Sequence, residues 1–128
     1  LDELDEVVNE YGDGLEKILT KIAQSGKGSF LAVLKLYGAE NENYLSFPIE
    51  GYSLALDFKI EEGLFELLDE LDEVVNEYGG RIYLTKDVRV SEEVFEKGYS
   101  KIDKFRAFRK ENNLDEKFNS LQSKRVGI

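Results

Sequence analysis

The sequence predicts an α+β fold, a ferredoxin-like antiparallel sheet with helices packed on one of its faces. Two stretches, 15–26 and 64–78, carry apolar residues at helical spacing, and a third, 52–60, alternates like a half-buried strand. The predicted order is helix, strand, strand, helix, strand, helix. At 128 residues, the chain is long enough for one hydrophobic core.

The first three elements follow from the spacing of their apolar residues. In "LEKILTKIAQSGKG", one helical face holds Leu15, Ile18, Leu19, Ile22 and Ala23. Gly26 is suited to end this helix. The next stretch, "SFLAVLKLYG", is apolar on both faces except at Lys35, as is typical of a central strand. The strand at 52–60 has one apolar face, and its other face carries Ser53, Ala55, Asp57 and Lys59.

The second helix contains a duplicated stretch, "LDELDEVVNEYG", found at 68–79 and, letter for letter, at 1–12. The copy at 68–79 continues a helical stripe that starts at Leu64 and ends on two glycines, so we assign it to the fold. The copy at 1–12 also has helical spacing. We expect 1–14 to be a helical segment of engineered or chimeric origin and 15–128 to form the domain. A tandem duplication is the alternative.

Such an extra helix could exchange between two copies of the chain, which predicts a helix-swapped homodimer. Further along, "RIYLTKD" (81–87) predicts a short strand, and Ser91 is a good N-cap for a last helix that runs to about Asn112.

Composition excludes several classes of function. The formal net charge of −10, half of which lies in 1–12, argues against a non-specific nucleic-acid binder. With no Cys and no His, the chain itself offers no disulfide, no zinc site and no Ser-His-Asp triad, so no metal is expected. The acidic N-terminus is not a signal peptide, and no apolar stretch approaches the roughly 18–20 residues of a membrane span. We therefore expect a cytoplasmic protein.

One face of the predicted sheet carries the candidate site. Lys35 interrupts an apolar strand and can project to the same side as Ser53, Ala55 and Asp57. Because Leu31 and Val33 share this side, it is too apolar for simple solvent surface and should cover something. The alternative for Lys35 is a lysine that only reaches solvent, and Asp57 could simply pair with Lys35 or Lys59.

Five blocks from 29 onward carry a resemblance: "SFLAVLKLYG", "LSFPIEGYSLALDF", "EYGGRIYLTKDVR", "GYSKIDKFRAFRK" and "FNSLQSKRVGI". In this order and spacing they resemble the C-terminal region of FAD-linked sugar oxidases of the vanillyl-alcohol oxidase superfamily. The resemblance implies a substrate, or cap, domain whose open sheet face lies toward a separate FAD-binding domain that this chain lacks. It also implies oxidation of a secondary alcohol in a sugar or polyol, with FAD in the full-length protein and none expected in this chain.

The resemblance also implies roles for single residues. The positions matching Lys35, Ser53 and Ala55 line the substrate pocket, and Asp57 lies on the same face. The positions matching Tyr83 and Lys86 approach the flavin ring, with Lys86 as the catalytic candidate. Ser53 and Ala55 replace Asn and Cys, which puts the particular sugar in question. Two other readings remain: a stand-alone module that binds a small ligand or a partner chain, and a rearranged module without activity.

Overall fold

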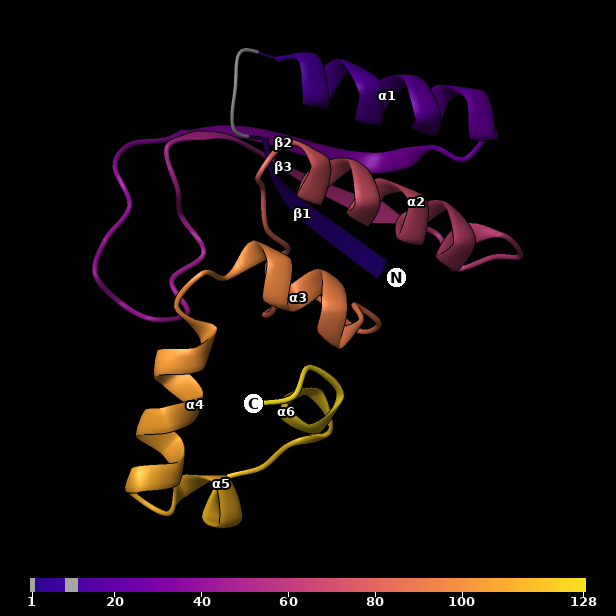
Figure 1. Ribbon diagram of the computed structural model, residues 1–128. Coiled ribbons are helices and arrows are strands. Elements are labelled where there is room, and N and C mark those ends of the chain that lie inside the picture. Colours follow the sequence, from indigo (N-terminus) through magenta and orange to yellow (C-terminus); the bar gives the residue numbers. More distant parts are fainter. Residues whose placement is uncertain (1, 9–11) are drawn as a thin grey trace.

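The computed structural model describes residues 2–8 and 12–128 and shows a three-stranded antiparallel sheet with helices (Figure 1). This arrangement confirms the predicted α+β class. The elements, in chain order, are β1 (Asp2–Val8), α1 (Asp13–Ser25), β2 (Ser29–Tyr37), β3 (Gly51–Phe58), α2 (Leu64–Glu77), α3 (Glu92–Gly98), α4 (Ile102–Glu111), α5 (Leu114–Lys117) and α6 (Leu121–Arg125).

The N-terminal segment is a strand, so the helix predicted over 1–14 is wrong for residues 2–8. β1 pairs antiparallel with β3, with Asp2 opposite Phe58 and Val8 opposite Tyr52. Residues 1 and 9–11 lie outside the described part of the chain. Pairing with β1 satisfies backbone N–H and C=O groups at an otherwise open edge of β3. The hydrogen bonds gained there stabilise a strand more than the helical spacing of the apolar residues stabilises a helix. The helix exchange expected between two copies assumed a helix here, so that prediction loses its basis.

Removal of residues 1–11 is expected to lower the melting temperature, because it takes away β1 and exposes one edge of β3. An open edge also templates pairing with other chains, so the shortened protein should form larger species. Thermal melting followed by circular dichroism, together with light scattering, measures both effects. An unchanged melting temperature and an unchanged mass would show that β1 contributes nothing to the fold.

The strand order is β1–β3–β2, so β3 is central and β2 lies at an edge. The prediction that residues 29–38 form a central strand is therefore wrong. A run that is apolar on both faces usually marks a strand covered on both sides. Within the described residues, however, β2 is open on both faces: Leu31 is 51% exposed on one face, and Leu36 is 70% exposed on the other. The sequence of β2 is thus typical of a covered strand, but the described residues leave it uncovered.

The core lies between β3 and the helices on one side of the sheet, where α1 and α2 run side by side (Figure 1). Leu54, Leu56 and Phe58 of β3 face this core. Helix α2 contributes Leu64, Leu67, Leu68, Leu71, Val74 and Val75, all buried. The copy at 68–79 therefore belongs to the fold, as predicted. Among the described residues, no helix is both long enough and apolar enough to cross a bilayer.

The chain after α2 departs from prediction in two places. Residues 81–87 form turns rather than a strand, and only Ile82 makes a bridge. The helix expected from Ser91 to about Asn112 is divided into α3 and α4, although Ser91 caps α3 as predicted, accepting a hydrogen bond from the Val94 N–H. At the end of α3, a Cβ on Gly98 would lie 2.9 Å from Cβ of Arg81. This close approach requires glycine.

Candidate functional site

The sheet register brings four of the six candidate residues to one face. Lys35 of β2 lies opposite Ser53 of β3, and the pairs Val33–Ala55 and Leu31–Asp57 continue the same row. Directly opposed residues of an antiparallel pair point to the same side of the sheet. We call this row the Lys35 face: Leu31, Val33, Lys35, Ser53, Ala55 and Asp57. It lies opposite the side chains of β3 that enter the core.

The Lys35 face is open along β2 but not along β3. Lys35 is exposed, and Leu31 is 51% exposed. Ser53, Ala55 and Asp57, in contrast, are buried. The prediction of an open face is therefore wrong for the central strand β3, although it holds for the edge strand β2. The face consists of a buried floor with one exposed apolar margin that carries an ammonium group.

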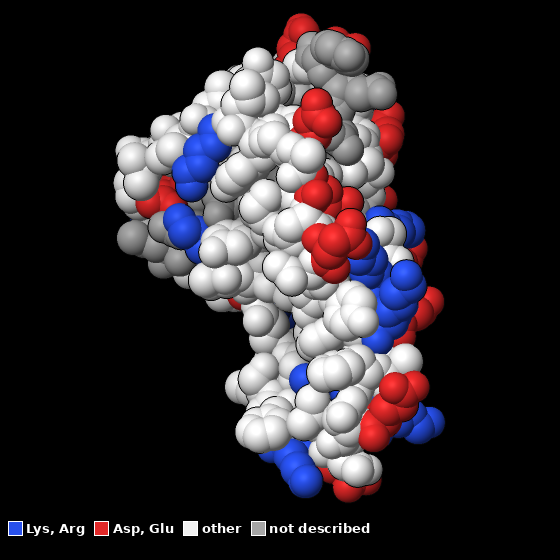
Figure 2. Space-filling view, turned by 90° about the vertical axis from the view of Figure 1, so that its left-hand side faces the viewer, with Lys and Arg blue, Asp and Glu red and all other residues white. Residues whose placement is uncertain are grey.

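Tyr83 is joined to the Lys35 face through two aromatic rings. Tyr37 lies two residues beyond Lys35 on β2 and therefore shares its face. The ring of Tyr37 meets Phe47 edge-on at 6.2 Å between centroids, and Phe47 lies 4.8 Å from Tyr83. Phe47 and Ile49 form a second small apolar cluster with these two tyrosines. Seen from the side of the 38–50 loop, much of the surface consists of uncharged residues (Figure 2).

Tyr83 and Lys86 both lie in the stretch Arg81–Val90, which we call the 81–90 segment. Its start is fixed by Arg81, which is buried and donates to Glu40 at 3.1 Å and to the Ser46 carbonyl at 2.8 Å. The Tyr99 hydroxyl donates to the Ile82 carbonyl at 2.7 Å. Burial raises the pKa of Tyr99, so its hydroxyl keeps the proton that it donates. Lys86 itself is half-buried.

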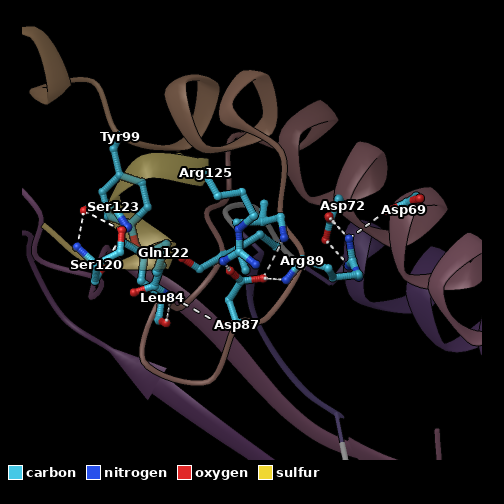
Figure 3. A network of polar contacts seen from close by, with 12 residues as sticks. Asp69, Asp72, Leu84, Asp87, Arg89, Tyr99, Ser120, Gln122, Ser123 and Arg125 are labelled. Carbon is cyan, nitrogen blue, oxygen red and sulfur yellow. Dashed lines mark hydrogen bonds and ion pairs between the residues drawn. The ribbon is translucent and has the colours of Figure 1, made fainter. Parts of the chain in front are cut away.

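The far end of the 81–90 segment is held by ion pairs with α2 and α6 (Figure 3). Arg89 pairs with both carboxylate oxygens of Asp72, at 2.7 and 3.0 Å, and with Asp69 at 2.7 Å. Asp87 accepts from the backbone N–H of Arg89 and pairs with Arg125. Burial raises the pKa of the Asp72 carboxyl to about 6, while the hydrogen bonds from Arg89 act in the opposite direction.

Sequence reasoning missed the residues that hold the site in place. The available signal for Phe47 is its place in a polar loop beside Pro48, since an aromatic residue there indicates packing. Arg81 follows two glycines, and Arg125 lies near the end of the sequence; neither pattern reveals a partner. These contacts join positions up to 41 residues apart in sequence, so no local spacing predicts them.

A cleft of about 1110 Å³ opens on the helix side of the sheet and does not contain the candidates. Leu34, Leu36 and Tyr52 line it, and they point to the other side of the sheet from Lys35. None of the six candidate residues is among its lining residues. Among the side chains that the structure describes, residues 12–128, no group of three or more acidic residues could hold a metal ion.

The fold and the Lys35 face define an α+β domain whose apolar sheet is partly uncovered. No family model matches the chain. The chain is 40% identical, over 122 residues, to decaprenylphosphoryl-beta-D-ribose oxidase of Mycolicibacterium smegmatis. It is 35% identical, over 117 residues, to a Streptomyces coelicolor protein described as an uncharacterized protein in the mprA 5' region.

These matches cover 95% and 91% of this chain but only 26% and 32% of the two relatives. The chain therefore spans about a quarter to a third of the length of the proteins it resembles. This confirms the predicted resemblance: the chain is related to one segment of a larger oxidase.

Proposed function

We propose that this chain is the substrate-covering domain of an FAD-dependent oxidoreductase that oxidises a secondary alcohol in a sugar or polyol. The observation that carries the proposal is the 40% identity to an oxidase over 95% of this chain. The matched region makes up about a quarter of the length of that oxidase. A segment of this kind acts together with the rest of its protein. Its partner would be the FAD-binding domain of the same protein.

The uncovered apolar margin of β2 supports this arrangement. On the Lys35 face itself, Leu31 and Val33 are exposed beside Lys35. Exposed apolar area of this extent is costly in water and marks a surface that is normally covered. An FAD-binding domain with bound substrate would cover the Lys35 face and exclude water from the reacting atoms.

The residues present fit the ring end of FAD. Pyrophosphate is usually held by a glycine-rich turn at a helix N-terminus, and we assign that part of the site to the FAD-binding domain. Tyr83 and Lys86, in contrast, offer a packed aromatic ring and an ammonium group on a braced segment. A bound flavin would supply the acceptor for the hydride. The chain's own residues would hold substrate and stabilise charge.

We assign the roles by position. Lys35, exposed on the open margin, would donate hydrogen bonds to substrate hydroxyls. Ser53, Ala55 and Asp57 would form the floor against which the substrate lies, and their size would select its shape. Tyr83 would contact the flavin ring. Lys86 would place its ammonium where negative charge develops, and it is therefore the catalytic candidate.

Removal of this segment from the full-length protein tests the proposal. The shortened protein is expected to keep bound FAD and its yellow colour but to lose oxidation of the substrate, for which decaprenylphosphoryl-β-D-ribose is the first choice. The isolated 128-residue chain should be colourless and inactive. Absorbance near the flavin bands and a substrate-dependent reduction assay measure both. A stoichiometric flavin spectrum in the isolated chain, or undiminished oxidation by the shortened protein, would contradict the proposal.

A further inference from the structure

The 81–90 segment has little regular structure of its own. Within it, the Lys86 N–H reaches the Tyr83 carbonyl at 3.3 Å, and the Asp87 N–H reaches the Leu84 carbonyl at 3.3 Å, both long for a backbone hydrogen bond. Only Ile82 makes a bridge of the sheet type. The position of Lys86 therefore depends on contacts from other elements.

Gln122 of α6 holds the backbone on both sides of Lys86. Its amide Nε2 donates to the Leu84 carbonyl at 2.5 Å and to the Asp87 carbonyl at 3.3 Å (Figure 3). These two carbonyls flank the turn that carries Lys86. One amide group thus spans the turn and fixes the distance between its ends.

Arg125, one turn further along α6, holds the carboxylate of Asp87. One oxygen of this carboxylate pairs with Arg125, and the other accepts the N–H groups of Arg89 and Val90, at 3.0 and 2.8 Å. The Asp87 side chain is only 4% exposed, so the pair is shielded from water. Asp87 follows Lys86 directly, and this pair therefore fixes the end of the turn.

Helix α6 is itself held in place. Ser120 and Ser123 form a reciprocal capping box at its start, and Val126 is fully buried in the core at its end. A short helix that is fixed at both ends can act as a rigid support for the turn.

We infer that Gln122 and Arg125 are positioning residues for Lys86, so that the C-terminal helix α6 sets the distance between the Lys86 ammonium and the reacting atoms. This inference rests on the proposed function. Neither side chain needs to touch substrate or flavin, because each acts through the backbone and carboxylate of the turn. Displacements of about 1 Å at a reacting group can cost up to about 100-fold in rate.

A double-mutant cycle in the full-length protein tests the inference. The four proteins are wild type, Gln122→Ala, Lys86→Ala and the double variant, and the reductant is decaprenylphosphoryl-β-D-ribose under anaerobic conditions. Gln122→Ala is expected to slow flavin reduction roughly tenfold, with little change in the substrate concentration at half-saturation. In the Lys86→Ala background the same change should have no further effect, because the group that it positions is absent.

Lys124→Ala is the matched control, since Lys124 is exposed on the same helix and should leave the rate unchanged. If Gln122→Ala does not fold, Gln122→Asn keeps the amide on a shorter stem and should give an intermediate rate. Equal slowing in both backgrounds, or no slowing in either, would overturn the inference while leaving the proposed function intact. A wild-type rate in Lys86→Ala would overturn the assigned role of Lys86 and this inference with it.

Discussion

Lys86→Ala in the full-length protein is expected to lower the rate of flavin reduction by a factor on the order of 100 or more, about the loss of one oxyanion-type donor. Hydride transfer leaves negative charge on the acceptor ring. The Lys86 ammonium would stabilise charge that exists only once transfer has begun, so it would lower the barrier more than it strengthens substrate binding. Its long apolar stem is suited to cross the half-buried surface and deliver the charge.

Lys35→Ala is the comparison, because Lys35 lies mid-strand on the open margin of the sheet. Its loss should mainly raise the substrate concentration needed for half-saturation and leave the limiting rate of reduction nearly unchanged. Anaerobic stopped-flow measurements over a range of substrate concentrations separate the two effects. If Lys86→Ala folds normally and reduces its flavin at the wild-type rate, the role assigned to Lys86 is wrong.

Arg89→Ala is expected to cost about 3 kcal/mol of the free energy of unfolding, since it leaves the Asp72 carboxylate buried without its partner. Asp72 is 1% exposed, so water cannot replace the lost hydrogen bonds. The loss should be smaller at pH 5 than at pH 8. The pKa of Asp72 is raised in the folded state, so its carboxyl becomes neutral at low pH, and a neutral carboxyl is less costly to leave without a partner. As the pH rises through that pKa, the carboxyl becomes charged, and the contribution of Asp72 to the free energy of unfolding falls.

Urea unfolding at the two pH values measures this loss. Lys97→Ala is the control, since Lys97 pairs with Glu93 on the surface of α3 and its removal should leave stability nearly unchanged. A second variant, Asp72→Asn combined with Arg89→Leu, removes both buried charges and should recover part of the loss. Equal stability of Arg89→Ala and wild type at pH 8 would show that the buried pair contributes nothing.

Much of the fold could be read from local spacing. The α2 stripe from Leu64, the alternation at 52–60 and the Ser91 cap are each set by neighbours within a few residues, and all three are found in the structure. The alternation also places Ser53 on the side of the sheet that Lys35 shares, because the apolar residues of β3 must face the core and the residues between them must face the other way.

The errors have a common cause, which is competition from distant parts of the molecule. "RIYLTKD" has strand propensity, but Arg81 and Asp87 are drawn into contacts with the 38–50 loop and with α6, and the stretch folds as turns. β2 is apolar on both faces, a pattern typical of a strand with other elements packed on both sides. Among the described residues, its side chains are exposed on both sides. Tertiary context decides such cases, and the sequence of one segment does not contain it.

The duplicated sequence shows how differently two positions in one fold constrain their residues. Asp2–Val8 and Asp69–Val75 have the same seven letters, yet the first is strand β1 and the second lies within helix α2. In α2 the stretch is specified by the apolar side chains that it buries, Leu71, Val74 and Val75. In β1 the same letters are held by backbone pairing with β3. One sequence thus takes the conformation that its neighbours in space can satisfy, so moving this stretch to another place in the chain need not carry its helix with it.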